Sequence, residues 1–386
     1  MKYDARKHNR RKHGMTRREF YSRVGLLHDV DALTTAAYNF IANKEQAESD
    51  IGAAAHDPWY VSFHGSQFPG DNPRACGRKA MYRMMDIPRP IAPRWLQQVA
   101  DAGKDIEDRL VQKWYDSGYL LSKPPYNYKG EKNHQDVFED ASVWLTSTVD
   151  AIVLFPNSGA GRVCEVKSKG SDEVHEMFKL YRGPDPAHIF QLKCQIGLAH
   201  EAGGWDVKRC YNSGRLAIEI GEREGKVVSV CPEHMHDRCL RDEHIEPPEG
   251  GTIYYVSRDW PADTWEFYYD YDPVFMEKGR AKLRDWREWF MRGELPQYNF
   301  EDKRFAHPMN WAWTKSKKDP LSPCEWCDYG DICRTDNRTA IKQGKPIKLS
   351  ESSGVEIAEE IREGFDLTRM RDAVLRRWNV NDTDGD

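Results

Sequence analysis

The chain has 386 residues, of which 39% are hydrophobic and 12% aromatic, so it has enough apolar material for a buried core and is not generally disordered. Its mean hydropathy is −0.80, and no apolar run approaches the roughly 18–20 residues of a membrane span, which argues against a membrane protein. The formal net charge of −5 does not by itself indicate a partner, because the distribution of charge matters more than its sum.

The two ends of the chain carry opposite charge. Residues 1–20 contain eight Lys or Arg, whereas residues 381–386 are acidic. The basic arm either follows a phosphate backbone or is a solvated tail, and the sequence favours neither interpretation. No apolar stretch follows the basic start, so it does not resemble a secretory signal, and we expect a cytoplasmic protein.

Helical and strand-like segments alternate along the chain. Residues 20–90 are expected to be mainly helical, with a loop over residues 64–73. The β-forming residues at 147–155 and 162–168 are joined by Asn, Ser and Gly, which predicts a hairpin. Further helices are expected over residues 93–117, 186–202, 273–293 and 355–378, and further strands over residues 208–212, 215–221, 227–230 and 251–256.

This order of elements predicts an α/β fold with a mixed central sheet flanked by helices. We divide the chain into a basic arm, a helical N-terminal region that carries Cys76, an α/β core, a cysteine-rich segment, and a C-terminal helix with an acidic tail. These parts cover residues 1–20, 21–92, 93–295, 296–345 and 346–386, respectively.

Three charged residues interrupt the two apolar strands of the predicted hairpin. Glu165 and Lys167 are two apart, so they project from the same face of a strand, and hairpin pairing brings Asp150 near Glu165. Such a patch suits phosphodiester hydrolysis, because carboxylates hold Mg²⁺ or Mn²⁺ and a lysine contacts the phosphate or orients the attacking water. An isolated pair of this kind is more often a surface ion pair, but the apolar flanks favour catalysis here.

Two neighbouring helices offer further polar groups. Glu107 shares a helix face with Gly103, which permits close approach of the helix to the sheet, although the neighbouring acidic residues also fit a plain exposed face. Gln191 begins the helical run after the hairpin and is a candidate to hold the lysine, the attacking water or a DNA phosphate. Without context, a polar helix residue is the more common interpretation.

The chain has nine cysteines, an odd number, and no export signal, so a disulfide framework is not expected. Cys324, Cys327 and Cys333 have the spacing of a metal or cluster site, and Cys76 is the best candidate for a fourth ligand. Zinc and a [4Fe–4S] cluster both suit four thiolates, and spacing alone does not choose between them. Either one would tie the two ends of the chain together.

A second group of potential zinc ligands lies between Cys231 and Cys239 and includes His234 and His236. Cys231 follows a predicted strand, and Cys239 is interpreted as a residue on the apolar stripe of a helix. A structural role for this segment is therefore favoured over metal binding.

Taken together, these motifs resemble the PD-(D/E)XK nuclease superfamily, specifically its RecB-like branch with an iron–sulfur cluster, over roughly residues 74–335. That branch includes the AddB nuclease domain and the CRISPR-associated RecB-like exonucleases. The resemblance implies a restriction-endonuclease-like sheet with a C-terminal iron–sulfur segment. It departs from the family pattern at three positions: Val149 replaces a proline, Glu107 replaces a frequent histidine, and Gln195 replaces a tyrosine.

The resemblance also assigns roles to individual residues. It implies Asp150, Glu165, Lys167 and Gln191 as catalytic residues. The implied ligands of Mg²⁺ or Mn²⁺ are Glu107, Asp150, Glu165 and the backbone carbonyl of Val166. Cys76, Cys324, Cys327 and Cys333 would hold a [4Fe–4S] cluster, with Zn²⁺ as the alternative. Arg78, Lys79 and Tyr82 would contact DNA.

The function that follows is a metal-dependent DNA exonuclease acting in recombination, repair or phage or CRISPR DNA processing. The sequence has no phosphate-binding loop of the G-x-x-x-x-G-K-[ST] type, so the chain would work alone or beside a helicase, a single-strand annealing protein or a CRISPR integration complex. The alternatives are a non-catalytic DNA-end-binding or assembly module on the same fold, and a zinc-stabilised binding protein of other ancestry.

Overall fold

The computed structural model describes residues 62–70, 72, 75–87, 94–155, 159–170, 173, 183–258, 264–296, 327, 329–361 and 365–378. The predicted basic arm, the acidic tail and Cys324 lie outside these residues. Of the predicted helical N-terminal region, the described part contains a short strand and one helix.

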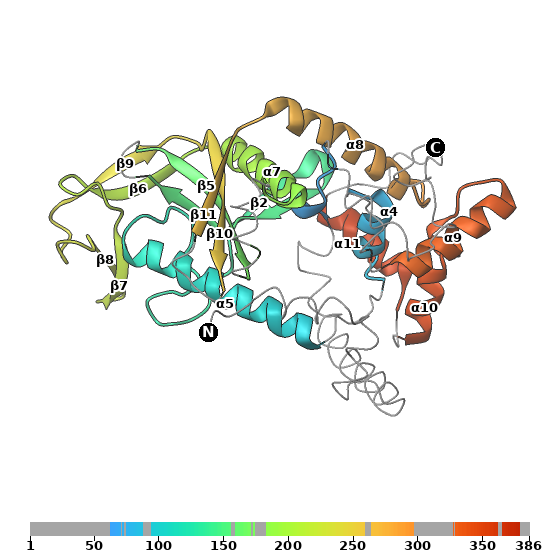
Figure 1. The fold of residues 1–386 in the computed structure, drawn as a ribbon, viewed down its shortest axis with the longest axis horizontal. Coiled ribbons are helices and arrows are strands. Elements are labelled where there is room, and N and C mark those ends of the chain that lie inside the picture. The colour runs from blue at the N-terminus through green and yellow to red at the C-terminus, as the bar shows by residue number, and fades with distance from the viewer. Residues whose placement is uncertain are drawn as a thin grey trace, which may run out of the picture.

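A four-stranded sheet forms the centre of the fold, in the order β11-β10-β5-β4 (Figure 1). Its strands are β4 (Ala151–Leu154), β5 (Gly161–Lys169), β10 (Gly250–Ser257) and β11 (Thr264–Asp270). β5 and β10 run parallel, whereas β4–β5 and β10–β11 pair antiparallel, so the sheet is mixed. The predicted β4–β5 hairpin is confirmed.

One helix covers each face of this sheet, as Figure 1 shows. α7 (Pro186–Ala202) packs Leu192, Ile196 and Ala199 against apolar side chains of β4, β5 and β10. α5 (Arg94–Asp116) packs on the other face, where Val111 meets Val166 and further small apolar side chains. The predicted α/β class, a mixed sheet flanked by helices, is therefore confirmed, and the predicted helices over 93–117 and 186–202 correspond to these two.

A second sheet has the order β1-β3-β2 and lies beside the first. Its strands are β1 (Phe63–His64), β2 (Val137–Asp140) and β3 (Leu145–Thr148), with short 3-10 turns at Gly65–Gln67 and Ala141–Val143. The predicted strand over residues 147–155 is wrong in one respect: the chain leaves this sheet after β3 and enters the central sheet at β4. Val149 and Asp150 occupy the break, because the two halves pair with different partners.

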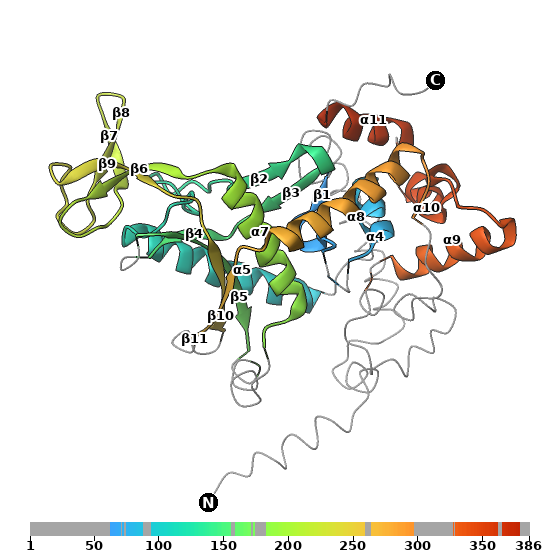
Figure 2. The ribbon, with the colours of Figure 1, turned by 90° about the horizontal axis from the view of Figure 1, so that it is seen from above.

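Four strands form a separate lobe at one end of the molecule (Figure 2). In chain order the lobe comes after α7 and before β10. β6 (Trp205–Cys210) pairs with β9 (Leu240–Ile245), and β7 (Ile218–Arg223) pairs with β8 (Lys226–Val230), both antiparallel. The strands predicted at 208–212, 215–221 and 227–230 are present with shifted ends. β9 was not predicted, because its sequence LRDEHI is mainly charged.

Helices from both ends of the described chain pack at the opposite end of the molecule (Figure 2). They are α4 (Gly77–Met84), α8 (Pro273–Met291), α9 (Gly330–Gln343), α10 (Ser353–Ile361) and α11 (Leu367–Arg377), with a 3-10 turn at Leu349–Glu351. The single helix predicted over 355–378 is instead two, because the Asp366 side chain caps the start of α11. No helix among the described residues is long and apolar enough to cross a membrane.

Candidate active site

Asp150 lies at the break between β3 and β4, where its side chain extends the ladder of the central sheet. Cys164 pairs with Ala151, the first residue of β4. Beyond that pair, Asp150 Oδ2 accepts a hydrogen bond from the backbone N–H of Val166 at 2.9 Å. Its other oxygen accepts one from the Gln135 side chain at 3.4 Å. The break in the strand thus turns the carboxylate toward β5 and fixes it there.

Glu165 and Lys167 project from the same face of β5, as the period of a strand requires. The Lys167 ammonium forms an ion pair with Glu165 and lies 3.9 Å from Asp150 Oδ2. Glu165 is completely buried, and its Oε2 accepts a hydrogen bond of 2.6 Å from the side-chain amide of Gln195 on α7. The same amide donates to the carbonyl of Thr148 at 2.9 Å, so α7 holds Glu165 beside the strand break.

α5 brings a further carboxylate toward this group from the other face of the sheet. Gly103 lies against β5 so closely that a Cβ there would lie 2.7 Å from Ser168 Oγ, which confirms the close approach predicted for this glycine. Glu107 lies one turn further along and faces inward, with 16% of its side chain exposed. Lys104 lies 3.7 Å from Glu107 and 3.2 Å from Asp108.

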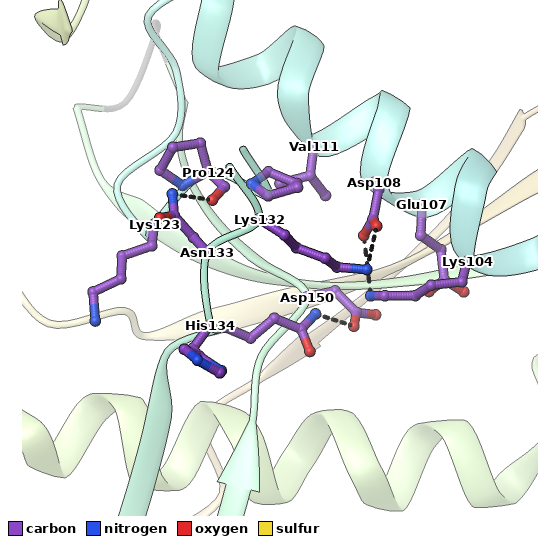
Figure 3. A pocket seen from close by; sticks show the side chains of 12 residues that line it. Lys104, Glu107, Asp108, Val111, Lys123, Pro124, Lys132, Asn133, His134 and Asp150 are labelled. Atoms are coloured by element: carbon purple, nitrogen blue, oxygen red, sulfur yellow. Dashed lines mark hydrogen bonds and ion pairs between the residues drawn. The ribbon is translucent and has the colours of Figure 1, made fainter. Parts of the chain in front are cut away.

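A cavity of about 210 Å³ opens beside Asp150 between α5 and the segment that precedes β2 (Figure 3). In the close view Lys132 and Lys104 both reach toward Asp108, and Lys132 Nζ lies 3.4 Å from its Oδ2. Lys123 and His134 line the left side of the cavity in this view. Asp150 and Glu107 therefore border a cavity that also carries several cationic side chains, which suits a polyanionic ligand.

Burial and mutual repulsion change the pKa values of the carboxyl groups in this site. Burial and the nearby Asp150 carboxylate raise the pKa of Glu165 to about 7. The same two causes raise the pKa of Glu107 to about 7. Burial alone would lower the pKa of Lys167, but Glu165, Asp150 and Glu107 outweigh it and hold that pKa above its usual range. Added positive charge would therefore stabilise the ionised carboxylates.

The donor set fits a hard divalent cation. Carboxylate oxygens are the ligands that Mg²⁺ and Mn²⁺ prefer, and Asp150, Glu107 and Glu165 supply them from three elements. Within the described part of the chain, the buried Oε1 of Glu165 has the Lys167 ammonium as its single partner. A bound cation would satisfy this oxygen and relieve the repulsion that raises the carboxyl pKa values.

Gln191 and Gln195 both lie on α7, which begins at Pro186. Gln191 lies one turn before Gln195 on α7, and among the described residues no hydrogen bond is recorded for its side chain. Gln195, which replaces the tyrosine of the family pattern, is the residue in contact with Glu165. The role of Gln195 was not predicted, because no neighbouring residue in this apolar helix indicates that the glutamine contacts Glu165 on a distant strand.

The predicted DNA contacts on α4 require a correction. Arg78 is buried and donates from Nε to the carbonyl of Pro296 at 2.7 Å, while Nη1 lies 3.9 Å from Cys333 Sγ. Tyr82 is fully buried and donates to Asp336 on α9 at 2.7 Å. Both side chains therefore serve the interior of the protein. Lys79 is half-buried on the same helix.

Three cysteines of the predicted cluster group lie in the described part of the chain. Cys76 immediately precedes α4 and is buried, and Cys333 lies on α9, in contact with Arg78 of α4. Cys327 packs against the same core. Cys324 lies outside the described residues. α4 and α9 are thus in contact, while the binding of a metal or cluster by these cysteines stays a prediction.

A different cysteine group converges in the lobe. Cys210, Cys231, His234 and Cys239 place their ligand atoms within 4.8 Å of one another, an arrangement that could bind a metal ion. Two interpretations of this segment were wrong: Cys239 lies in a turn before β9 rather than on a helix, and metal binding is favoured by the geometry. Cys210 was not predicted to belong to this group, because it comes from β6, another strand of the lobe.

No family model matches the chain, and no curated protein does either. Among solved structures, the chain is similar to an alkaline exonuclease, LHK-Exo from Laribacter hongkongensis, with 8% identity and a TM-score of 0.34 over 59% of this chain and 87% of that one. The structure of LHK-Exo in complex with dAMP covers the same shares, with 10% identity and a TM-score of 0.33. Likeness at this level does not define a family, so the function rests on the geometry of the site.

Proposed function

We propose that the chain is a metal-dependent deoxyribonuclease whose active site contains Asp150, Glu165 and Lys167. The observation that carries the proposal is the convergence of these three side chains at the break between two sheets, with Glu107 facing them from α5. A buried carboxylate in such a place is costly unless it is paired or holds a cation. The presence of three carboxylates around one lysine favours catalysis over a purely structural role.

Each residue has a distinct task in this proposal. Asp150, Glu107, Glu165 and the carbonyl of Val166 would hold Mg²⁺ or Mn²⁺, which when bound supplies an activated water and neutralises charge on the phosphate. Gln195 positions Glu165 through its amide. Lys167 contacts the scissile phosphate or orients the attacking water, and the lysines of the cavity draw in the DNA backbone. Gln191 is a further candidate for contact with substrate.

The finer assignments extend the same proposal. We infer exonuclease action on DNA, with a helicase, a single-strand annealing protein or a CRISPR integration complex as the candidate partner. Cys76, Cys324, Cys327 and Cys333 are proposed to hold a [4Fe–4S] cluster, with Zn²⁺ as the alternative. The contact between α4, which Cys76 precedes, and α9, which carries Cys333, supports a clamp of this kind.

The test is hydrolysis of end-labelled linear DNA by the purified chain with Mn²⁺ or Mg²⁺. Lys167→Ala should reduce the rate by about 10²–10⁴-fold, the range for loss of a proton-transfer or phosphate-orienting group. Lys169→Ala is the matched control, because Lys169 projects from the same face of β5 and pairs only with Glu173 among the described residues. It should keep the wild-type rate.

Two outcomes would contradict the assignment. Equal rates for wild type and Lys167→Ala would show that the cleavage arises elsewhere. Binding of DNA ends by the wild type, without cleavage under any divalent metal, would favour the non-catalytic end-binding module instead. Lys167→Ala removes the counter-ion of buried Glu165 and should lower the melting temperature, so each rate is measured well below the melting temperature of its variant and expressed per folded protein. Lys169→Ala should melt as the wild type does.

A further inference from the structure

The four side chains of the lobe have the spacing of ligands around one small ion. His234 Nδ1 lies 3.5 Å from Cys210 Sγ, 3.3 Å from Cys231 Sγ and 3.6 Å from Cys239 Sγ. In a tetrahedron with Zn–S of about 2.3 Å and Zn–N of about 2.0–2.1 Å, a sulfur and a nitrogen lie about 3.6 Å apart. The three distances therefore agree with a common tetrahedral centre.

Two turns of matching shape supply the ligands Cys210 and Cys231. In each, a cysteine starts the turn and its carbonyl accepts a 2.8 Å hydrogen bond from the residue four positions on, Gly214 for Cys210 and Met235 for Cys231. That fourth residue has positive φ in both turns, 70° for Gly214 and 53° for Met235. A methionine in this conformation is strained unless its surroundings hold it there, and it directly follows His234.

Backbone N–H groups within both turns point at the sulfur atoms. The N–H of Ser213 donates to Cys210 Sγ at 3.4 Å. The N–H groups of Glu233 and His234 donate to the sulfur of Cys231. Such bonds favour the thiolate, which is the form that binds a metal. The two sulfur atoms lie within 4.8 Å of each other and of the ligand atoms of His234 and Cys239, and this orientation toward one point indicates a ligand.

The lobe has almost no hydrophobic core of its own apart from these sulfurs. Cys210, Cys231 and Cys239 are each 1% exposed or less, and together they form its buried cluster, with Leu240 packed against them. A unit of this size cannot bury enough apolar surface to offset the entropy of ordering its strands. Small units of this kind are typically held by a metal or by disulfides, and these cysteines are all free.

We propose that Cys210, Cys231, His234 and Cys239 bind Zn²⁺ in a closed tetrahedral site that folds the β6–β9 lobe. Three thiolates and one imidazole select a soft or borderline ion and disfavour the Mg²⁺ or Mn²⁺ of the candidate active site. Because the protein supplies all four ligands, the site has no open position for substrate, and its role is structural. It is separate from the cysteine group of α4 and α9.

The lobe also touches the end of the helix that carries Glu107. The backbone N–H of Leu216 donates to the carbonyl of Gly118 at 2.7 Å, and Arg215 donates to the carbonyl of Ser117 at 3.4 Å. Tyr115, in the last turn of α5, accepts a 2.7 Å hydrogen bond from the N–H of Glu219. A folded lobe therefore braces the C-terminal end of α5, and loss of the zinc ion should loosen it.

Metal analysis of the purified full-length chain tests the proposal. The wild type should carry about one zinc ion per chain attributable to this site, and Cys231→Ser or Cys239→Ser should remove it. Cys194→Ser is the matched control, because Cys194 is equally buried but lies on α7, outside the group. Cys327→Ser, analysed for iron and zinc together, separates any metal held by the other cysteines. Zinc content that is unchanged in Cys231→Ser and Cys239→Ser would overturn the assignment.

A conservative variant keeps the test decisive if the serine variants fail to fold. His234→Cys should retain the tetrahedral site, and in protein loaded with Co²⁺ it should strengthen the thiolate-to-cobalt absorption, because a fourth sulfur replaces nitrogen. An identical spectrum for wild type and His234→Cys would exclude His234 as a ligand. Titration of thiols in the denatured, metal-free wild type should find all nine cysteines reduced. A count of seven that rises to eight in Cys231→Ser would show a disulfide at Cys231 in place of zinc.

Discussion

Glu165 illustrates how the surroundings of a single residue set its chemistry. Its carboxylate has no contact with solvent, and the Lys167 ammonium and the Gln195 amide hold its two oxygens. Removal of the Lys167 ammonium would leave this buried charge without its counter-ion, which typically costs several kcal/mol. Gln195 is therefore a positioning residue: it acts on substrate only through the carboxylate that it orients.

His64, at the end of β1, is a second buried titratable residue. Its Nδ1 accepts hydrogen bonds from the N–H of Ser66 at 3.3 Å and the Ser66 hydroxyl at 2.9 Å, so the neutral ring caps the 3-10 turn that follows. Burial, with a smaller contribution from Arg83, lowers its pKa to about 2. The folded protein thus resists protonation of a group that protonates near pH 6.5 once the chain unfolds.

This difference predicts a specific loss of stability in acid. Because the folded pKa of His64 is depressed, its contribution is complete above pH 6.5 and falls progressively as the pH drops toward 2, by up to about 1.4 kcal/mol per unit. His64→Asn keeps an acceptor for the Ser66 N–H and removes the titration. Urea unfolding between pH 7 and pH 4 should show a shallower loss for His64→Asn than for wild type. His134→Asn, at an exposed position, should keep the wild-type slope.

At the scale of elements, the approach of α5 to β5 decides whether Glu107 reaches the site. Gly103 lies at the point of contact, where an added Cβ would meet Ser168 Oγ at 2.7 Å and Ser168 Cβ at 3.9 Å. A glycine within a helix costs about 1 kcal/mol relative to alanine. The helix keeps this cost because the sheet leaves no room for a larger side chain beside the serine hydroxyl.

A double-mutant cycle measures that contact. Gly103→Ala alone should gain little stability, since the helix preference is offset by displacement of Ser168. Gly103→Ala combined with Ser168→Ala should recover most of the gain of about 1 kcal/mol, with a coupling of at least about 0.5 kcal/mol. Ala102→Gly, on the exposed side of α5, calibrates the helix preference and should lose about 1 kcal/mol. Strictly additive changes would contradict the close contact.

The elements that were predicted correctly are those with local signals. α7 and α8 each begin with an aspartate cap followed by proline, and their length makes the helical period visible. The β4–β5 hairpin is also local, and it was enough to place Asp150 beside Glu165. β1, β2, β9 and β11 were not predicted. For β9 and β1 the reason is that their pairing, rather than their composition, makes them strands.

The parts of the site that were missed depend on distant segments of the chain. Lys132 reaches Asp108 from the segment before β2, and Gln195 reaches Glu165 from α7. Neither contact corresponds to a regular residue spacing that could be recognised in the sequence. Cys210 joins the lobe's metal-binding group from β6 for the same reason. Arg78 and Tyr82 were misassigned to a surface because a basic and aromatic helix gives no indication that another helix covers it.

At the scale of the whole molecule, one buried carboxylate joins helices from the two ends of the described chain. Asp336 on α9 is 1% exposed and accepts hydrogen bonds from Tyr82 of α4 at 2.7 Å and from the Ser352 hydroxyl at 2.6 Å. The N–H and hydroxyl of Ser353, at the start of α10, each donate to its other oxygen at 2.8 Å. Both oxygens are thus fully used between three helices.

Replacement of this carboxylate should destabilise the protein more than any surface change. Asp336→Ala would leave the Tyr82 and Ser352 hydroxyls buried without their acceptor, at about 1–3 kcal/mol each, so we expect a loss of at least about 2 kcal/mol in urea unfolding. Asp336→Asn keeps one acceptor oxygen and should fall between alanine and wild type. Asp105→Ala, at an exposed position of α5, should stay within about 0.5 kcal/mol. If Asp336→Ala proved as stable as Asp105→Ala, α4 and α9 would be held together by something other than this carboxylate, and the cysteines beside them would be the next candidates.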